Sequence, residues 1–342
     1  MSRRAFTTLL AAVLAAVLAI GGAFLSVPYV TLSPGPAFNT LGTVGAAEVL
    51  TITGGKTYPT DGALDATTVS VTDHVTLFEA IRGWFSSSDA VVPRELVYPP
   101  DQDRQQTDER NAQDMRQSQD DATIAAMKVL GIVGTIEVSV GVITKGGPAQ
   151  GRLQVGDVLT TVDGKAVADI EGLRRLISAR RPGQPVVIGY RRSGKAATAR
   201  LTTVATPDAE RRAVIGIQAS TTSQFPVEVE IRLKDVGGPS AGLMFALGII
   251  DKLQPGSLTG GRVIAGTGEI TQDGKVGAIG GIAQKMRGAT RVDADAFLVP
   301  AGNCPEAKRY RPDGLQLVKV ATLADALAAL KTLRAGGTPP TC

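Results

Sequence analysis

Residues 234–250 read K-D-V-G-G-P-S-A-G-L-M-F-A-L-G-I-I. The G-G-P at 237–239 predicts a tight turn, because glycine adopts backbone angles that other residues avoid and proline suits the first turn of a helix. The apolar run after it predicts a buried helix. Ser240 should therefore lie at the positive end of this helix, where free backbone N–H groups can hold a developing anion. Two roles remain open for Ser240: a nucleophile beside an oxyanion hole, or a simple N-cap.

The candidate base for this serine is a lysine, because the only histidine, His74, lies far upstream. Residues 238–242, G-P-S-A-G, match the G-x-S-x-G pattern of α/β-hydrolases, but that fold needs a histidine after the serine. Lys285 falls on the apolar face of a helix predicted over residues 281–292, and burial would lower its pKa. The alternative is a lysine whose stem runs along the core while its ammonium reaches water.

Three segments together form a more specific pattern. They are P-S-A-G around Ser240, T-G-E-I from Thr267 to Ile270, and G-G-I-A-Q-K ending at Lys285. This pattern closely resembles the proteolytic domain of the Lon family of serine proteases, over residues 226–330. The resemblance implies an α+β domain in which Ser240 is the nucleophile and Lys285 the general base. It also places Thr267 near the lysine, where its hydroxyl would orient the amine.

The sequence departs from the Lon pattern at two places. Lon has an aspartate three residues before the serine, whereas this chain has Gly237, with Asp235 nearby but offset. Residues 55–57, G-K-T, resemble the end of a P-loop, but Leu50 stands where that motif needs its first glycine. We therefore expect no ATPase module and proteolysis that does not need ATP.

In the expected reaction, backbone N–H groups around Gly238 and Ser240 would hold the oxyanion.

The middle of the chain carries a second resemblance. The motifs G-P-A, L-Q-V-G-D-V-L and V-D-G-K-A-V follow one another between residues 147 and 167, and a helix is predicted at 169–179. This order looks like a bacterial PDZ domain, with a carboxylate-binding loop near residues 131–138. PDZ domains add an extended peptide to a sheet edge. The expected partners are thus protein or peptide substrates bound through exposed or C-terminal tails.

The N-terminus predicts a membrane anchor. Arg3 and Arg4 precede an uncharged apolar stretch over residues 5–30, long enough to cross a bilayer. Positive flanks stay in the cytoplasm, so a single-pass cell-membrane protein with extracytoplasmic PDZ and protease domains is expected. A cleaved signal peptide is the alternative. A bacterial family of membrane-bound PDZ–Lon proteins exists, and the chain resembles it over most of its length.

The predicted fold class is α+β: an N-terminal transmembrane helix, a β-rich PDZ domain with two helices, and a Lon-type α+β proteolytic domain. The predicted ranges are an anchor at 1–30, a β-rich region with a polar linker at 31–121, the PDZ domain at 122–205, the proteolytic domain at 206–335 and a frayed tail at 336–342. Strands at 44–72 would belong to the protease fold, with the PDZ domain inserted into it.

The remaining predictions concern local structure. Residues 101–121 are highly polar and predict a solvated linker or exposed helix, followed by a short amphipathic helix at 122–130. Strands are predicted at 296–299 and 315–320. Thr322 and Asp325 form a capping-box pattern at the start of a final helix.

Composition narrows the partners. The formal net charge of +4 is small and dispersed, which gives no reason to expect nucleic acid binding. One histidine and two distant cysteines, Cys304 and Cys342, cannot form a standard zinc site, so no metal or cofactor is expected. Whether these cysteines pair stays open, as does a homo-oligomer, since Lon-like domains often form rings. The predicted function is an ATP-independent, membrane-anchored serine endopeptidase, and the alternative is a non-catalytic membrane-bound PDZ adaptor.

Overall fold

The computed structural model describes residues 3–99, 104–206, 208–233 and 236–342 and has the mixed α+β fold that the sequence predicts. Lys234 and Asp235 lie outside the described residues, so the position of Asp235 relative to Ser240 is not described. The chain divides into two compact units. The first contains Met1–Ile52, Lys56–Leu130 and Val229–Cys342, and the second contains Thr53–Gly55 and Gly131–Glu228.

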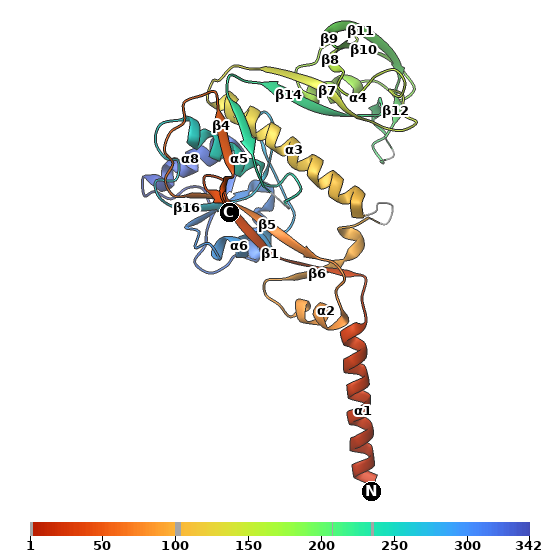
Figure 1. Cartoon of the computed structure of the whole chain (residues 1–342), viewed down its shortest axis with the longest axis vertical. Helices are drawn as coiled ribbons and strands as arrows, with labels where there is room; N and C mark the ends of the chain where they lie inside the picture. Colours follow the sequence, from red (N-terminus) through yellow and green to blue (C-terminus); the bar gives the residue numbers. More distant parts are fainter. Residues whose placement is uncertain (1–2, 100–103, 207, 234–235) are drawn as a thin grey trace. The chain divides into compact units, whose positions relative to one another are not determined.

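A six-stranded sheet forms the centre of the first unit (Figure 1). Its strands, in spatial order, are β20 (Gln316–Val320), β19 (Ala296–Pro300), β16 (Val263–Gly266), β5 (Ala63–Thr72), β1 (Tyr29–Asn39) and β6 (Ala90–Pro93). The strands from β20 to β5 are parallel, and β1 is antiparallel to both of its neighbours. Ala265 on β16 pairs with Phe297 on one side and Asp65 on the other. Part of the predicted 44–72 region therefore pairs with the C-terminal half of the chain.

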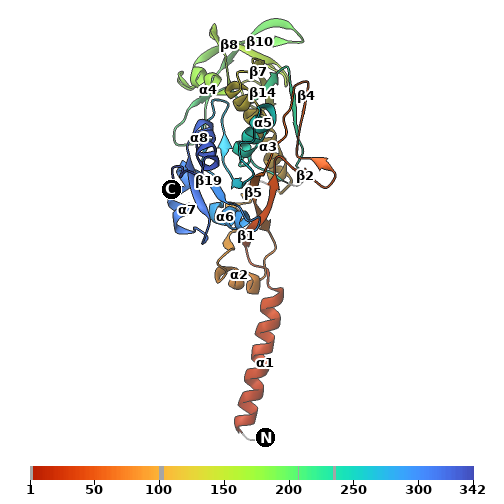
Figure 2. The same cartoon turned by 90° about the vertical axis from the view of Figure 1, so that its left-hand side faces the viewer.

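Two helices cover opposite faces of this sheet. Helix α6 (Ile282–Thr290) packs on β1 and β5 (Figure 2), and Ala265 joins the apolar cluster that contains Ile282. The next residue, Gly266, faces α5 (Gly242–Leu253), since a Cβ there would lie 2.7 Å from the Met244 sulfur. Successive strand residues point to opposite faces. The ends of both helices can therefore meet only at an end of the sheet, here the carboxyl end of β16.

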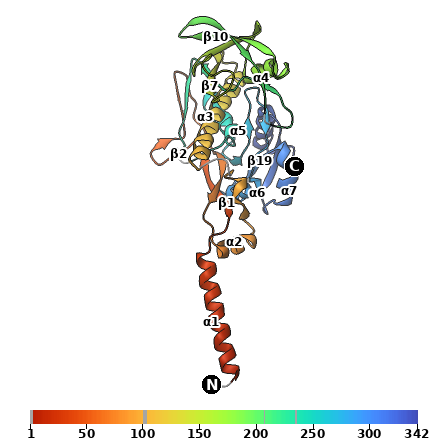
Figure 3. The same cartoon turned by 90° about the vertical axis from the view of Figure 1, so that its right-hand side faces the viewer.

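The polar stretch before the second unit forms one long helix, α3 (Arg104–Val129), which packs along α5 (Figure 3). The predicted break before a separate short helix at 122–130 is therefore wrong, whereas the alternative of a helix over the polar stretch is confirmed for residues 104–121. Up to Ala122 only a narrow stripe of α3 is buried, including Met115 and Ser118, and residues 124–127 are then all buried, while most of the charged side chains remain at the surface. A helix can bury such a stripe although its overall composition is polar.

The N-terminal apolar stretch forms a shorter helix than predicted. Helix α1 (Arg3–Phe24) ends at Phe24, and the chain enters the central sheet at Tyr29. Within the described part of the chain, no helix is both long and apolar enough to cross a membrane. The transmembrane span over residues 5–30, and the single-pass membrane location inferred from it, are therefore wrong predictions.

Shorter elements complete the first unit. They are β2 (Thr43–Val44), β3 (Ala47–Glu48), α2 (Leu77–Trp84), β17 (Glu269–Ile270), β18 (Val276–Gly277), α7 (Cys304–Arg309), α8 (Leu323–Arg334), and 3-10 turns at Arg94–Leu96 and Ala301–Asn303. Strands β4 (Leu50–Thr53) and β15 (Glu228–Ile231) also lie in the first unit except for Thr53 and Glu228, which fall in the second. The capping box of Thr322 and Asp325 at the start of α8 is confirmed. Cys304 and Cys342 form a disulfide, and the Lys319 N–H donates to the Pro340 carbonyl. The C-terminal tail is thus held against the unit rather than frayed.

The second unit contains a six-stranded sheet, in which five strands form one ladder and β9 pairs with β8, and one main helix among its described residues. Its elements are β7 (Thr135–Ile143), β8 (Val158–Val162), β9 (Lys165–Ala166), α4 (Ile170–Ser178), β10 (Pro185–Arg192), β11 (Lys195–Thr202), β12 (Val204–Ala205), β13 (Ala213–Val214) and β14 (Ile217–Gln224). The ladder order is β11-β10-β8-β7-β14. Ser193 and Gly194 both have positive φ in the two-residue turn between β10 and β11, as a tight hairpin requires.

This second unit extends further along the chain than the predicted PDZ range. Strand β14 pairs with β7 from Thr135 to Ile143, which brings residues up to Glu228 into the unit. Helix α3, in contrast, falls in the first unit. The ranges 122–205 and 206–335 therefore differ from the limits of the compact units, and they stay predictions.

Candidate active site

The serine loop lies directly before α5. Gly238 has a φ of +82°, a left-handed conformation that side chains other than glycine rarely adopt. Ala241 is the N-cap of α5 and its side chain makes no capping hydrogen bond. Ser240 precedes the cap and is half-buried. The hydroxyl of Ser240 is thus not used as a helix cap, which removes the simpler of its two predicted roles.

Lys285 reaches this serine from α6. The lysine lies in the first turns of the helix, after Gly281, and its residue is only 3% exposed. Its Nζ is 2.6 Å from the Ser240 Oγ and 2.9 Å from the Thr267 Oγ1. The side chain therefore ends inside the unit, and the alternative of an ammonium that reaches water does not apply.

Thr267 holds both partners. It follows β16, is fully buried, and its hydroxyl donates to the Ser240 carbonyl at 2.9 Å while its oxygen accepts from Lys285. The Gly268 N–H donates to the same carbonyl at 2.8 Å. The carboxyl end of β16 therefore fixes the serine backbone and the lysine amine at once. Thr267 thus lies within hydrogen-bonding distance of the lysine amine.

The surroundings of Lys285 lower the pKa of its amine. Burial lowers the pKa of Lys285 from 10.5 to about 8, and the Glu269 carboxylate partly counters this by raising it. The pKa of Glu269 is raised mainly by burial and also by Asp114, while Lys285 lowers it. A lysine with a pKa near 8 is neutral in a substantial fraction at mildly alkaline pH, as a general base requires.

The expected oxyanion donors need one correction. The Gly238 N–H donates to the Asn111 carbonyl of α3 at 2.9 Å, so it is not free to hold an anion in this conformation. Pro239 has no N–H. The N–H groups of Ser240 and Ala241 make no hydrogen bond to any of the described residues. These two groups, at the positive end of α5, are the available donors.

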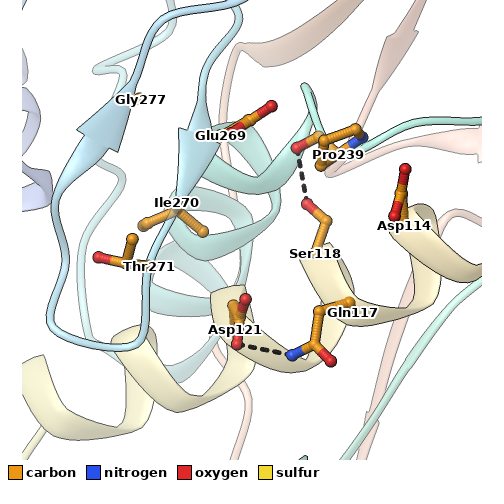
Figure 4. Close-up of a pocket in the computed structure, with 9 residues that line it drawn as sticks. All are labelled: Asp114, Gln117, Ser118, Asp121, Pro239, Glu269, Ile270, Thr271 and Gly277. Carbon is orange, nitrogen blue, oxygen red and sulfur yellow. Dashed lines mark hydrogen bonds between the residues drawn. The ribbon is translucent and has the colours of Figure 1, made fainter. Parts of the chain in front are cut away.

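Helix α3 contributes contacts that the sequence did not suggest. Besides Asn111, it places Ser118 at the loop, where the hydroxyl donates to the Pro239 carbonyl at 2.8 Å (Figure 4). The only apolar residues between 101 and 121 are Ala112 and Met115, so no periodic pattern marked this buried face. Ser118 and Pro239 are 121 residues apart in the sequence, so neither segment alone indicates that they are in contact.

A pocket of about 200 Å³ lies between α3 and β17, next to Pro239 (Figure 4). Three carboxylates line it: Asp114 and Asp121 from α3, and Glu269. Burial raises the pKa of Asp121, and hydrogen bonds from Gln272 and Gln117 lower it. The pocket is adjacent to the serine loop and offers room for a side chain.

Other candidate groups are elsewhere. The side chain of His74 is 78% exposed and lies 3.8 Å from the Asp73 carboxylate, as expected for a surface residue. Among the residues with described positions, no three His, Cys, Asp or Glu side chains gather as metal ligands.

In the second unit, β7 has β8 on one side and β14 on the other. An added peptide strand would need the outer edge of β14 or β11, or would have to displace β14.

Comparison with known proteins gives two family matches. Residues 108–203 match the PDZ domain family, and residues 232–331 match the Lon protease (S16) C-terminal proteolytic domain. The PDZ match includes most of α3, which the structure groups with the first unit. The proteolytic match includes Ser240, Thr267 and Lys285.

Similar proteins cover only parts of the chain. The Lon protease of Lachnoclostridium phytofermentans is 32% identical over 96 residues, which cover 26% of this chain and 11% of that protein. Lon protease 2 of Bacillus subtilis is 32% identical over 92 residues, covering 27% of this chain and 16% of that protein. The PDZ domain of an SdrC-like protein from Listeria monocytogenes is 28% identical with a TM-score of 0.23, covering 24% of this chain and 85% of that domain. The chain thus aligns with less than a fifth of the curated relatives' own length.

Proposed function

Because the chain combines a PDZ domain with a Lon-type C-terminal proteolytic domain, we propose that it is a serine endopeptidase that uses Ser240 and Lys285 and does not need ATP. The observation that carries this proposal is the distance of 2.6 Å between the Lys285 Nζ and the Ser240 Oγ, with the lysine buried. ATP independence is supported by Leu50, which interrupts the single P-loop-like stretch.

The reaction would proceed through an acyl-enzyme. Neutral Lys285 takes the Ser240 proton as the Oγ bonds to the scissile carbonyl carbon, and the carbonyl electrons move to its oxygen. The N–H groups of Ser240 and Ala241 would donate to this oxyanion. The protonated lysine then gives its proton to the leaving amine as the C–N bond breaks. A water molecule repeats the attack with Lys285 as base, which releases the acid and restores the serine.

Thr267 and the second unit have supporting roles in this proposal. By accepting from the lysine and donating to the serine carbonyl, Thr267 keeps the amine directed at the nucleophile. The PDZ domain would present protein substrates through extended tails, since such domains bind peptides by strand addition. The outer edges of β14 and β11 are the places where an extra strand could pair without removing one of the existing strands.

The proposal is tested with the full chain and an unfolded protein substrate that carries an exposed C-terminal tail. Cleavage should occur without nucleotide and in the presence of a metal chelator. Ser240→Ala should remove cleavage but leave binding of the tail peptide unchanged, because the serine lies in the first unit. Binding of the tail without any cleavage by the unaltered chain would favour the adaptor instead. Cleavage that survives Ser240→Ala would reject this serine as nucleophile.

A further inference from the structure

The hydrogen bond from Ser118 to Pro239 links a helix outside the matched proteolytic domain to the peptide unit that precedes the nucleophile. Ser118 is 3% exposed, and its Oγ lies 2.8 Å from the Pro239 carbonyl oxygen. Gly242 permits this approach, because a Cβ at that position would fall 2.7 Å from the Ser118 Oγ. The contact is thus tightly packed, and a side chain on the first residue of α5 would disturb it.

This bond fixes the direction of one N–H group. The Pro239 carbonyl and the Ser240 N–H belong to the same trans peptide unit. In a planar trans unit the C=O and the N–H point in opposite directions. Since Ser118 holds the carbonyl toward α3, the Ser240 N–H points away from α3.

The peptide unit needs such a contact. The proline ring fixes φ of Pro239 but leaves its ψ free, so the unit that follows can rotate. The other donor to this carbonyl among the described residues is the Gly242 N–H at 3.4 Å, longer than the usual range for an N–H···O bond. The neighbouring Gly238 N–H is already bound to Asn111 on the same helix. Ser118 is therefore the main restraint on how the Pro239–Ser240 unit is turned.

We propose that Ser118 is a positioning residue of the peptidase, which holds the Pro239–Ser240 peptide so that the Ser240 N–H can donate to the oxyanion. This inference rests on the proposed function and extends it to α3. The hydroxyl of Ser118 bonds to the Pro239 carbonyl. The amine of Lys285 bonds to other residues, Ser240 and Thr267. The effect of Ser118 passes through the peptide unit and should appear in the transition state rather than in substrate binding.

The test compares Ser118→Ala with the unaltered chain. Removing an oxyanion donor outright lowers kcat about 10²- to 10³-fold. Because the Gly242 N–H still restrains the unit, we expect Ser118→Ala to lower kcat about 10- to 100-fold, with KM changed less than about twofold. A peptide aldehyde, which forms a tetrahedral adduct with Ser240, should bind weaker by the same factor as kcat/KM. A non-reactive product peptide should bind as before.

Three further measurements separate positioning from loss of structure. The midpoint of the pH–rate curve should not move, because the contacts of Lys285 are intact. Ser118→Thr, which keeps the hydroxyl, should recover part of kcat. Thr123→Ala is the matched control, since Thr123 lies on the same helix and its hydroxyl bonds to the Gln119 carbonyl of that helix. It should leave kcat unchanged. If Ser118→Ala does not fold, Ser118→Cys keeps a side chain of the same shape with a much weaker donor and should show the same loss.

The outcomes distinguish failure of the proposed function from failure of the inference about Ser118. An unaltered chain that neither cleaves peptides nor binds the aldehyde would overturn the proposed function and this inference with it. An active unaltered chain whose folded Ser118→Ala or Ser118→Cys variant keeps its kcat and aldehyde affinity would overturn this inference alone. Equal weakening of the aldehyde and the product peptide would also overturn it, because the residue would then act on ground-state binding.

Discussion

Replacement of Lys285 by arginine keeps a positive charge in the site but removes the base. Lys285 has a pKa of about 8, lowered from 10.5 by burial. At pH 8 about half of the lysine is therefore neutral, against about 0.3% for a pKa of 10.5. Burial thus increases the reactive fraction about 150-fold at this pH.

Arginine cannot follow the lysine into this range. The pKa of arginine lies well above that of lysine, and the same lowering would leave about 1% of the guanidinium or less neutral at pH 8. We therefore expect Lys285→Arg to reduce kcat/KM at least about 50-fold at pH 8. Lys285→Ala should be inactive as well. The activity of the unaltered chain should rise with pH through a midpoint near 8 and then level off.

The assay is cleavage of an internally quenched peptide at saturating and limiting concentrations between pH 6 and pH 10. Lys252→Arg is a matched control, because Lys252 is also largely buried, with a 13% exposed side chain, and pairs with Glu48 away from the serine. It should keep near-normal activity. Retention of more than half of the rate by Lys285→Arg at pH 8 would refute the reasoning, as would a flat profile for the unaltered chain.

Three more predictions follow from other contacts. Glu269→Gln removes the carboxylate that raises the pKa of Lys285, so the midpoint of the pH–rate curve should fall below that of the unaltered chain. Glu306→Gln is the distant control. An unchanged or higher midpoint in Glu269→Gln would contradict this prediction. The disulfide of Cys304 and Cys342 closes a loop of 38 residues, and its chain-entropy contribution is about 4 kcal/mol. Reduction, or serine at both positions, should lower the free energy of unfolding by about 2–4 kcal/mol in urea titrations, and no change would argue against the bond. Excess free tail peptide should slow cleavage of tailed proteins but not of short peptides, and equal slowing of both would argue against presentation by the PDZ domain.

The central pair of residues could be predicted because each carries a local signal. A G-G-P turn before an apolar run indicates a loop-to-helix junction at Ser240, and helical periodicity places Lys285 on a buried face. The strands at 296–299 and 315–320 and the capping box at Thr322 were also found from local patterns. The structure places Ser240 and Lys285 within hydrogen-bonding distance, although nothing in one segment alone requires it.

The predictions that failed depend on contacts between distant segments. Asn111 and Ser118 lie in a polar stretch, and only the packing of α3 against the serine loop shows that this face is buried. Gly238 was expected to offer its N–H to an anion, yet Asn111 already occupies that group. The extent of α1 was overestimated because hydropathy alone does not show that the chain leaves the helix at Phe24.

The central claim is that Ser240 attacks a carbonyl carbon. It is tested most directly by treating the full chain with an acylating or phosphonylating serine-directed inhibitor and mapping the modified peptide by mass spectrometry. We predict one adduct per chain on Ser240, formed faster as the pH rises toward 9 and slowed strongly in Lys285→Arg. The absence of an adduct on Ser240, or an adduct formed equally fast in Lys285→Arg, would contradict the claim.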